Sequence, residues 1–258
     1  MRISVVTVCF NSERTIADCA ASVLAQRGID VDYIIIDGGS KDNTLARLAP
    51  YRDGVATLVS ERDRGIYDAM NKGLARAKGE FVGFLNSDDF FSSPDALAKL
   101  ACALDDSKAD AAFGDIAQIN AAGRLLRIYS GDNFKMQKLT RGRYPPHPGF
   151  YARTGVLREL GGFNTDLRIA ADFDLMIRFF TRPGMRWVYV PERIVTMRAG
   201  GASHQGLMAY VSNSQEIVRA CKDRGLKPSH LAIYGRVFRK GLEAATGLVQ
   251  GHFGKSRS

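Results

Sequence analysis

Continuous apolar runs recur along the first ninety residues of the chain. Four of them, Ile3 to Cys9, Val31 to Ile36, Val55 to Val59 and Phe81 to Leu85, are rich in β-branched and aromatic residues and have the length of strands. A run that is apolar at every position suits a strand covered on both faces, as in a parallel sheet. We therefore predict four strands in this part of the chain.

The segments between these runs carry apolar residues at helical spacing. One such segment, containing Ile16, Cys19, Ala20 and Val23, follows the polar pair 11–12 (Asn11 and Ser12), which we expect to cap a helix. Another, Ile66 to Ala77, reads as a helix closed by Gly79. Strands that alternate with helices predict an α/β fold: a mostly parallel sheet with helices on both of its faces.

The second half of the chain shows a less regular pattern. Residues 144–149 contain three prolines and predict an ordered loop, because proline breaks helices. Beyond His204 the pattern is helical to the end of the chain. Between Pro94 and this loop we predict a helix at Asp95 to Leu104, a strand at Ala109 to Ile116 and a hairpin turning at 121–123. Between the loop and His204 we predict a helix at Asp172 to Phe180 and a strand at Trp187 to Val190.

The composition is that of a folded chain with one main domain. The chain has 258 residues, of which 45% are hydrophobic, and its net charge is +9. Residues 219–258 hold nine cations and two anions, so nine minus two places +7 there and leaves only +2 for residues 1–218. A nearly neutral body does not indicate a nucleic-acid-binding surface, and we expect no nucleic-acid partner.

Cysteine spacing and hydropathy bear on where the chain works. The four cysteines form no CxxC pair and no zinc-ligand spacing, which favours free thiols in a reducing compartment. The longest apolar runs are far shorter than the roughly 20 residues that a membrane-spanning helix needs. The polar residues 11–14 follow the first apolar run at once, unlike a secretory signal. We expect a cytoplasmic protein.

Carboxylates follow two of the predicted strands. Asp37 ends the second strand, and Asp88 and Asp89 follow the fourth. Ligands of open parallel sheets bind at the carboxyl ends of the strands, so we expect these acids to meet at one edge. Paired carboxylates suit a Mg²⁺ or Mn²⁺ ion whose other ligands are phosphates and water, although a surface turn explains the pair equally well. The chain contains neither GxxxxGK[ST] nor GxGxxG.

Four motifs together carry a resemblance to a known family. They are the segments 4–11 (SVVTVCFN), 36–44 (IDGGSKDNT), 65–73 (GIYDAMNKG) and 79–89 (GEFVGFLNSDD), and they are followed by His147-Pro148-Gly149 and Ala171-Asp172-Phe173-Asp174. Their order and spacing resemble those of the family-two inverting glycosyltransferases, which have a GT-A fold with a Rossmann-like sheet. The resemblance covers most of residues 1–95. It implies a nucleoside-diphosphate-sugar donor, a Mn²⁺ or Mg²⁺ cofactor and inversion at the transferred sugar's anomeric carbon.

The resemblance also assigns roles on the donor side. It implies that Asp37 contacts the donor base, that Asp88 binds the donor ribose or the metal, and that Asp89 binds the metal. Many relatives have another Asp where this chain has Asn86. Asp37 is also explained as a turn-forming residue before two glycines. Arg64 and Asp68 lie near the implied donor site, but an exposed arginine in a charged run is also typical of a solvated ion pair.

The general base is implied to be Asp172. Single-displacement transfer needs a carboxylate that takes the proton of the attacking acceptor hydroxyl, and Asp172 matches the family's base, with Ala171 where another acid is usual. The alternative is that Asp172 and Asp174 favour a helix N-terminus, and Asp174 is the second candidate base. His147 could line the acceptor site or hold the diphosphate, and His204 could supply a third metal ligand; both are also explained as structural residues.

The basic end of the chain predicts an amphipathic helix. From Leu231 to Val249, apolar residues recur every three or four positions with Arg236, Arg239 and Lys240 between them. Such a helix either lies on an anionic membrane or packs on the domain. We therefore divide the chain into a domain at 1–218, with a donor-nucleotide half (1–95) and an acceptor half (96–218), and a basic tail at 219–258. Membrane binding would suit a peripheral enzyme on the inner face of the cell membrane.

The leading hypothesis is a glycosyltransferase that acts on a glycan or lipid-linked glycan acceptor in cell-surface polysaccharide biosynthesis. A sugar-nucleotide nucleotidyltransferase also uses an α/β sheet and paired carboxylates, but it usually has a Gly-rich basic loop near the first strand, which this chain lacks. A non-catalytic carbohydrate-binding or membrane scaffold protein is the third hypothesis. The presence of Asp37, Asp88, Asp89 and Asp172 argues against it.

Overall fold

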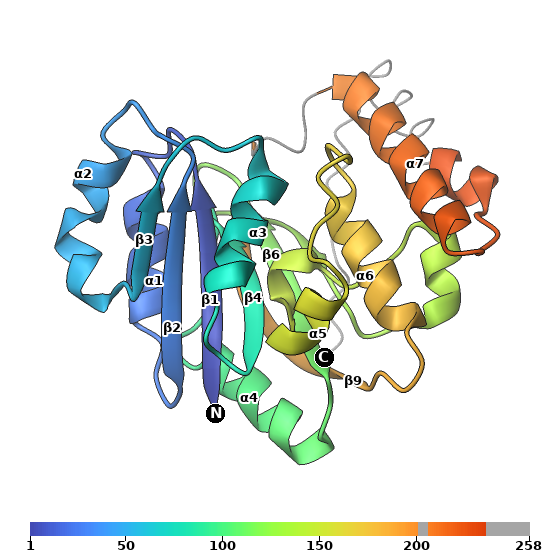
Figure 1. Cartoon of the computed structure of the whole chain (residues 1–258), viewed down its shortest axis with the longest axis horizontal. Helices are drawn as coiled ribbons and strands as arrows, with labels where there is room; N and C mark the ends of the chain where they lie inside the picture. Colours follow the sequence, from blue (N-terminus) through green and yellow to red (C-terminus); the bar gives the residue numbers. More distant parts are fainter. Residues whose placement is uncertain (201–205, 236–258) are drawn as a thin grey trace.

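The computed structural model describes residues 1–200 and 206–235. Its centre is one mixed sheet of nine strands in the described residues, in the order β3-β2-β1-β4-β8-β6-β9-β5, with β7 paired to β6 outside this path. Helices cover both faces of the sheet (Figure 1). The α/β class and the helix-covered sheet are thus confirmed.

The first half of the chain forms the parallel part of the sheet. Strands β1 (Arg2–Cys9), β2 (Asp30–Asp37), β3 (Thr57–Ser60) and β4 (Phe81–Asn86) pair in parallel, as the four apolar runs predict. Their connections are α1 (Ile16–Leu24), α2 (Thr44–Leu48) with the 3-10 helix η1 (Ala49–Gly54), and α3 (Ile66–Arg76). The carboxyl ends of these strands lie at the top of Figure 1.

Two local predictions in this half are wrong. Asn11 and Ser12 do not cap α1 with their side chains; instead, the Asn11 Oδ1 accepts from the Lys41 N–H at 2.9 Å, and the Ser12 N–H donates to the Thr44 Oγ1 at 2.7 Å. Gly79 does not close α3, which ends at Arg76. A Cβ at Gly79 would lie 2.4 Å from the Ser4 backbone nitrogen, so glycine is needed there because two backbones approach closely.

The second half confirms the predicted strand at 109–116 and the hairpin that turns at 121–123, and it adds antiparallel pairing through a strand at 150–153 that the pattern does not predict. Strand β8 (Phe150–Arg153) pairs antiparallel with β4 and with β6 (Ala111–Ile119), so β6 runs in the same direction as β4. Strand β9 (Trp187–Arg198) pairs parallel with β6 and is longer than the predicted strand 187–190. Two short strands complete the sheet, β5 (Phe90–Phe91) on β9 and β7 (Leu125–Tyr129) on β6. Helices α4 (Ala96–Ser107) and α6 (Ala171–Thr181) confirm the predicted helices, and α5 (Thr154–Glu159), η2 (Met136–Arg141) and η3 (His147–Gly149) are additional.

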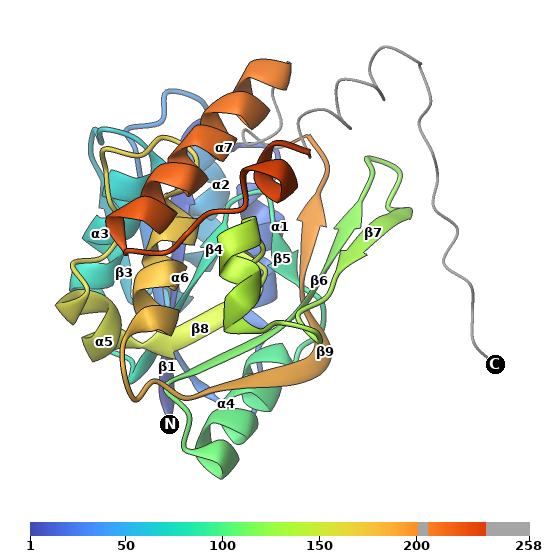
Figure 2. The same ribbon diagram turned by 90° about the vertical axis from the view of Figure 1, so that its right-hand side faces the viewer.

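Apolar side chains on the two faces of the sheet build two core layers. Alternating residues of β1 show the division, with Val6 and Val8 in one layer and Val5 in the other. The first layer is completed by α3, α5, α6 and α7 (Gly206–Asp223), and the second by α1, α2 and α4. Figure 2 shows α3, α5, α6 and α7 together on one side of the sheet. Both layers leave the carboxyl edge of the sheet to loops.

The C-terminal region packs on the domain as far as it is described. Helix α7 ends at Asp223, and a second helical stretch covers residues 230–235, so the predicted continuous helix is interrupted at 224–229. Cys221 and Ile233 are fully buried, whereas Leu231 is 88% exposed. Residues 219–235 therefore pack on the domain, whereas residues 236–258, which hold most of the predicted amphipathic helix, lie outside the described residues. Among the described helices, none combines the length and apolarity that crossing a bilayer requires.

Candidate active site

Strand register brings the acids of β2 and β4 to one edge of the sheet. Asp37 is level with Cys9 at the end of β1, and Asn86 at the end of β4 is level with Val8. Because neighbouring strands lie about 4.8 Å apart, the ends of β2 and β4 are separated by about 10 Å across β1. Asp88 and Asp89 continue directly from Asn86, so these carboxylates share the carboxyl edge that the sequence predicts.

Asp37 is fully buried, and its carboxylate is occupied by its own turn. One oxygen accepts from the Gly39 N–H at 3.2 Å, the Ser40 N–H at 3.0 Å and the Ser60 hydroxyl at 2.6 Å. The other accepts from the Ser40 hydroxyl and lies 3.7 Å from the Cys9 sulfur. These bonds fix the turn after β2 and tie it to β3. The structure thus supports the turn-forming explanation of Asp37.

A cavity of about 380 Å³ lies directly beyond this turn. It is lined by Phe10, Gly38, Gly39, Lys41, Arg62 and Asp63. Phe10 is 59% exposed, which leaves a flat aromatic face available for a planar ring. The cations Lys41 and Arg62 and the carboxylate of Asp63 also line the cavity. The cavity therefore offers stacking, a hydrogen-bond acceptor and positive charge within one recess at the carboxyl edge.

Asp63 is the carboxylate of this cavity, and the sequence analysis missed it. Its Oδ1 accepts from the Gly65 N–H at 2.9 Å, while its Oδ2 points at Gly38, where a Cβ would come within 2.4 Å. Glycine at position 38 thus leaves the room that the Asp63 carboxylate occupies. Asp63 was not singled out from the sequence because it lies in the charged run 61–64, and such runs usually form solvated surfaces.

Arg64 and Asp68 pair with each other. The Asp68 carboxylate accepts from the Arg64 N–H at 3.1 Å and from the Arg64 guanidinium at 3.2 Å, and the Lys72 ammonium lies 3.7 Å away. The Arg64 N–H bond is the main cause that lowers the pKa of Asp68. The Arg64 side chain is 83% exposed. In the structure this pair orders the start of α3, which agrees with the ion-pair alternative.

Asp88 and Asp89 differ in their surroundings. Asp88 is half-buried, and its backbone carbonyl accepts from the Arg198 guanidinium at 3.0 Å. Asp89 is 2% exposed, and its Oδ2 has no hydrogen-bond partner within residues 1–200 and 206–235. Burial, and next the Asp88 carboxylate, raise the pKa of Asp89 well above its ordinary value. A buried, unpartnered carboxylate oxygen is costly unless a cation or another ligand balances it.

A second unpartnered oxygen stands beside it. The Oδ1 of Asn86 is buried and also has no hydrogen-bond partner in the part of the chain that the structure describes. Carboxylate and amide oxygens are ligands that Mg²⁺ and Mn²⁺ accept, so the residues at the end of β4 fit a divalent cation. Within residues 1–200 and 206–235, no three His, Cys, Asp or Glu side chains converge on one point. A cation here would need further ligands from outside this set, such as phosphate oxygens and water.

His204, the candidate third ligand, lies outside the described residues. The chain can be followed up to Gly200. Arg198, at the end of β9, donates to the Asp88 carbonyl and to the Asp18 carboxylate, the latter at 2.7 Å, and its guanidinium lies 4.8 Å from the centre of the Phe90 ring. These contacts attach the end of β9 to the Asp88–Asp89 segment.

Asp172 lies at the first turn of α6 among aromatic side chains. Its Oδ2 accepts from the Tyr144 hydroxyl at 3.1 Å, and its Oδ1 accepts from the Phe173 N–H at 2.7 Å. The side chain is half-buried, and desolvation raises the pKa of Asp172. A raised pKa makes an ionised carboxylate a stronger proton acceptor, which is the property that a general base needs.

His147 connects Asp172 to the end of β4. Its ring stacks on Phe84, with centroids 5.8 Å apart, and meets Phe163 edge-on at 5.7 Å. Burial lowers the pKa of His147, whereas the Asp172 charge acts in the opposite direction. The Nε2 of His147 is buried and has no hydrogen-bond partner among the described residues. Phe84 precedes Asn86 by two positions, so Asp172 and the Asp88–Asp89 pair approach the same edge from two elements.

The direction of α6 explains this placement. Strand β9 runs parallel to β6 and in the direction of β4, so it begins at the amino edge of the sheet. Helix α6 ends at Thr181, five residues before β9 begins, and its own first turn therefore lies at the opposite edge. Figure 1 shows α6 starting on the side where β1, β2 and β4 end.

Asp174, the second candidate base, is engaged elsewhere. It is buried, and its Oδ2 accepts from the Arg178 guanidinium twice, from Nε at 2.9 Å and from Nη2 at 2.7 Å. Arg178 also donates to the carbonyls of Leu160 and Gly162. The pair anchors the loop between α5 and α6, and the Asp174 carboxylate does not join the site around Asp172.

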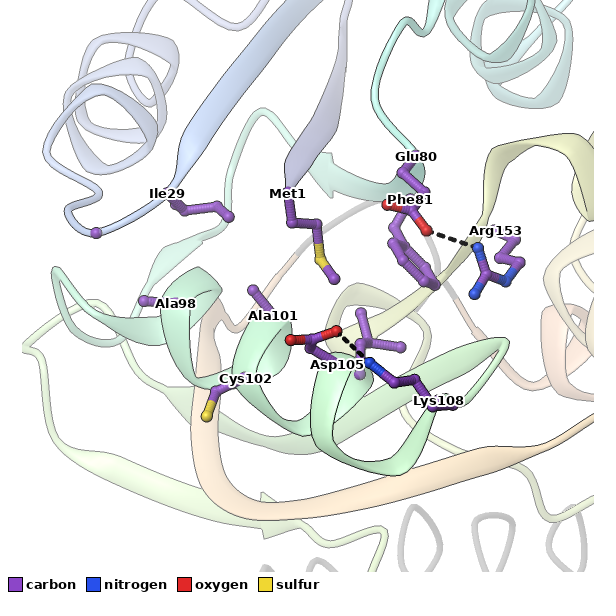
Figure 3. Close-up of a pocket in the computed structure, with 12 residues that line it drawn as sticks. Met1, Ile29, Glu80, Phe81, Ala98, Ala101, Cys102, Asp105, Lys108 and Arg153 are labelled. Carbon is purple, nitrogen blue, oxygen red and sulfur yellow. Dashed lines mark hydrogen bonds and ion pairs between the residues drawn. The ribbon is translucent and has the colours of Figure 1, made fainter.

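A larger cavity, of about 580 Å³, lies at the amino edge of the sheet (Figure 3). Its charged side chains are paired with each other, Glu80 with Arg153 at 2.6 Å and Asp105 with Lys108 at 2.8 Å. Met1 and Phe81 supply apolar surface between them. Because the charges are matched and the acids at the carboxyl edge are distant in the fold, we place the functional site at the carboxyl edge.

Comparison with known proteins agrees with this geometry. The family model described as glycosyl transferase family 2 matches residues 4–161. An uncharacterized glycosyltransferase of Mycobacterium tuberculosis is 34% identical over 183 residues, which cover 68% of this chain and 68% of the relative. Residues 4–161, which the family model matches, contain the cavity around Phe10 and the acids at the end of β4.

Two solved structures share the fold at 18% identity. Residues 1–349 of Staphylococcus aureus TarS, in complex with UDP-GlcNAc, match with a TM-score of 0.68 over 96% of this chain and 73% of that one. The mannosyltransferase PcManGT of Pyrobaculum calidifontis, in complex with GDP-Man and Mn²⁺, matches with a TM-score of 0.61 over 96% of this chain and 76% of that one.

Proposed function

Because this chain belongs to glycosyl transferase family 2 and is therefore a glycosyltransferase, we propose that it is a metal-dependent, inverting enzyme. Its donor would be a nucleoside-diphosphate sugar, and its acceptor a hydroxyl of a glycan or lipid-linked glycan. The observation that carries this proposal is that the half-buried Asp172 and the paired Asp88 and Asp89 approach one edge of the sheet. Membership of this family argues against the two alternative hypotheses, a nucleotidyltransferase and a non-catalytic scaffold protein.

The cavity at Phe10 suits the nucleoside of the donor. A base stacked on the exposed Phe10 ring could donate an N–H to the Asp63 Oδ2, which faces Gly38. Asp37 would act indirectly, since its hydrogen bonds hold the turn that forms one wall. We therefore move base recognition from Asp37 to Asp63 and keep Asp37 as the residue that positions the turn.

The end of β4 suits the diphosphate of the donor. Asp88 and Asp89 would hold Mn²⁺ or Mg²⁺ together with the Asn86 Oδ1, and phosphate oxygens would complete the ligand set. When bound, the cation neutralises the charge that builds up on the departing diphosphate. The presence of Mn²⁺ in the structure of the similar mannosyltransferase supports this part of the proposal.

Asp172 would serve as the general base. The acceptor oxygen attacks the anomeric carbon while the bond from that carbon to the diphosphate oxygen breaks, and the electron pair leaves with the diphosphate. The hydroxyl proton passes to the Asp172 carboxylate, whose pKa is raised by burial. Attack from the face opposite the leaving group inverts the anomeric configuration. The Tyr144 hydroxyl would hold this carboxylate in place.

Asp172→Asn tests the assignment against a matched control. The variant keeps the size of the side chain but removes the proton acceptor, so turnover should fall at least 100-fold while donor binding stays within about threefold of wild type. Asp166→Asn, an exposed acid in the loop before α6, should change neither. Loss of donor binding in Asp172→Asn, with turnover of the bound fraction retained, would assign Asp172 another role.

A further inference from the structure

The segment 120–143, which we term the β7 segment, concentrates positive charge. It holds Arg124, Arg127, Lys135, Lys138, Arg141 and Arg143 against the single anion Asp132, and six minus one gives +5 in 24 residues. In the described part of the chain, none of these six cations forms an ion pair with a carboxylate. All except Lys138 are exposed. The charge is therefore free to meet an external anion.

The same segment exposes large apolar side chains. Leu125 is 52% exposed, Leu126 53%, Ile128 44% and Met136 40%. Single exposed apolar residues are ordinary on a protein surface, but four within twelve positions form a patch that calls for a partner. The pairing of β6 with β7 shifts at Leu126, because Ile119 is level with Leu125 and Gln118 with Arg127. On this strand, exposed apolar side chains thus flank the cation Arg127.

The hairpin of β6 and β7 turns at the active edge of the sheet. Strand β6 runs in the direction of β4, so its turn at 120–124 lies on the side where Asp88 and Asp172 are found. At its base, Ile119 pairs with Leu125 on one side and with Arg198 on the other, and Arg198 donates to the Asp88 carbonyl. Figure 2 shows β7 standing away from the helices at the edge of the molecule.

The other end of the β7 segment leads into the site as well. Residue 144 follows it directly, and the Tyr144 hydroxyl donates to the Asp172 carboxylate. A surface bound by the β7 segment would therefore lie beside both the end of β4 and the proposed base.

We propose that the β7 segment docks on the surface of an anionic phospholipid bilayer. Arginine and lysine meet the lipid phosphates, and the side chains of Leu125, Leu126 and Ile128 enter the boundary between headgroups and acyl chains. The consequence for catalysis rests on the proposed function: a lipid-linked acceptor held in that bilayer would reach Asp172 from the side of the β7 segment.

A second copy of the chain fits this surface less well. Strand β7 is an open edge, and pairing it with the β7 of another copy would be the simplest alternative. Arg127 is the central residue of β7, so a two-fold antiparallel pair that matches all five residues of the strand places Arg127 opposite Arg127. Like charges directly opposite each other destabilise such a pair. An anionic lipid surface has no such conflict.

Vesicle binding of the full chain tests the proposal with matched substitutions. Wild type should cosediment with vesicles of phosphatidylcholine and phosphatidylglycerol more than with phosphatidylcholine alone, and less at high salt. Leu126→Ser/Arg127→Gln should weaken binding to the anionic vesicles roughly tenfold. The control Leu45→Ser/Arg47→Gln makes the same two changes at exposed positions of α2 and should bind like wild type.

Each other outcome overturns the proposal. It fails if wild type does not prefer anionic vesicles, or if the β7 variant and the α2 control bind equally. A wild-type dimer in light scattering that the β7 variant abolishes would assign the surface to a second copy. Arg141→Gln/Arg143→Gln repeats the test on a second pair of exposed cations should the first variant lose its native melting transition. Donor hydrolysis without vesicles should persist in all these variants, so failure of the proposed function shows separately, in Asp172→Asn.

Discussion

The Tyr144 hydroxyl donates a hydrogen bond of 3.1 Å to the Oδ2 of Asp172, across 28 positions of sequence. Burial raises the pKa of Asp172, and the Tyr144 hydrogen bond opposes that rise because it stabilises the ionised carboxylate. Tyr144 therefore lowers the pKa of Asp172 in the same direction as the His147 charge and the Phe173 N–H, which have larger effects. It is a positioning residue that acts through Asp172.

Tyr144→Phe should move the pH dependence of transfer. Without the hydroxyl, the pKa of Asp172 rises further, and since transfer needs the ionised form, the acidic limb of kcat/KM should move to higher pH. Activity on the alkaline side of that limb should change much less. A pH profile of the variant that superimposes on the wild-type profile would contradict the role of Tyr144.

Asp174→Asn separates a structural carboxylate from a catalytic one. The substitution leaves the buried Arg178 guanidinium without its countercharge, and breaking a buried pair in this way costs about 3–5 kcal/mol of the free energy of unfolding. The change should appear in denaturant unfolding. In the fraction that stays folded, the pH profile of transfer should match wild type; a shifted acidic limb would return Asp174 to the list of bases.

Asp89→Asn should stabilise the metal-free protein. Because the pKa of Asp89 is raised in the folded state, the folded chain binds more protons than the unfolded chain between the two pKa values, and stability falls as pH rises through that window. At neutral pH the buried charge of Asp89 therefore lowers the free energy of unfolding of the metal-free protein. Removing it should raise Tm by about 2–4 °C, on the order of 1 kcal/mol for a chain of this size.

The same substitution should abolish the stabilisation that Mn²⁺ and a nucleoside diphosphate give together, because the cation loses a ligand. Differential scanning calorimetry with and without ligands reads both effects. A lower Tm of the metal-free Asp89→Asn variant would show that the Asp89 charge is balanced inside the protein and needs no cation.

Gly38→Ala tests the cavity beside Phe10. The added Cβ would meet the Asp63 Oδ2 at 2.4 Å, and since this atom ends a movable side chain, Asp63 should shift while the fold persists. We expect a Tm close to wild type and nucleoside-diphosphate affinity about tenfold lower, the loss of one hydrogen bond to a charged group. Gly155→Ala is the control, because a Cβ there meets nothing within 4 Å. Unchanged affinity in Gly38→Ala would move base recognition away from Asp63.

The parallel half of the sheet could be predicted because its pattern is local. Each strand from β1 to β4 is a continuous apolar run, and the edge at which Asp37 and Asp88 meet follows from parallel pairing alone. Strands β8 and β6 pair antiparallel beside them, and β8 is only four residues long. Such a short strand is stabilised by its neighbours in the sheet, and the hydrophobic pattern of the strand itself does not reveal those neighbours.

Some of the site residues could likewise be predicted from local sequence, whereas others depend on contacts between distant parts of the chain. Asp88, Asp89 and Asp172 are visible in the sequence because they follow a strand or match a family motif. Asp63 is not, since its significance depends on the missing Cβ of Gly38, a residue in a different loop. Asp174 lies two positions after Asp172, in the first turn of the same helix. Only the position of Arg178, one helical turn beyond Asp174, distinguishes the paired carboxylate from the available one.

Calorimetric titration of the nucleoside diphosphate into wild type and into Asp88→Asn/Asp89→Asn tests the central claim most directly. Our account holds that the acids at the end of β4 bind the donor diphosphate through a divalent cation. It predicts that wild type binds at least tenfold more tightly with Mn²⁺ than with a chelator present, and that the double variant binds weakly under both conditions. Equal affinity of wild type with Mn²⁺ and with chelator, or a double variant that retains the Mn²⁺ effect, would contradict it.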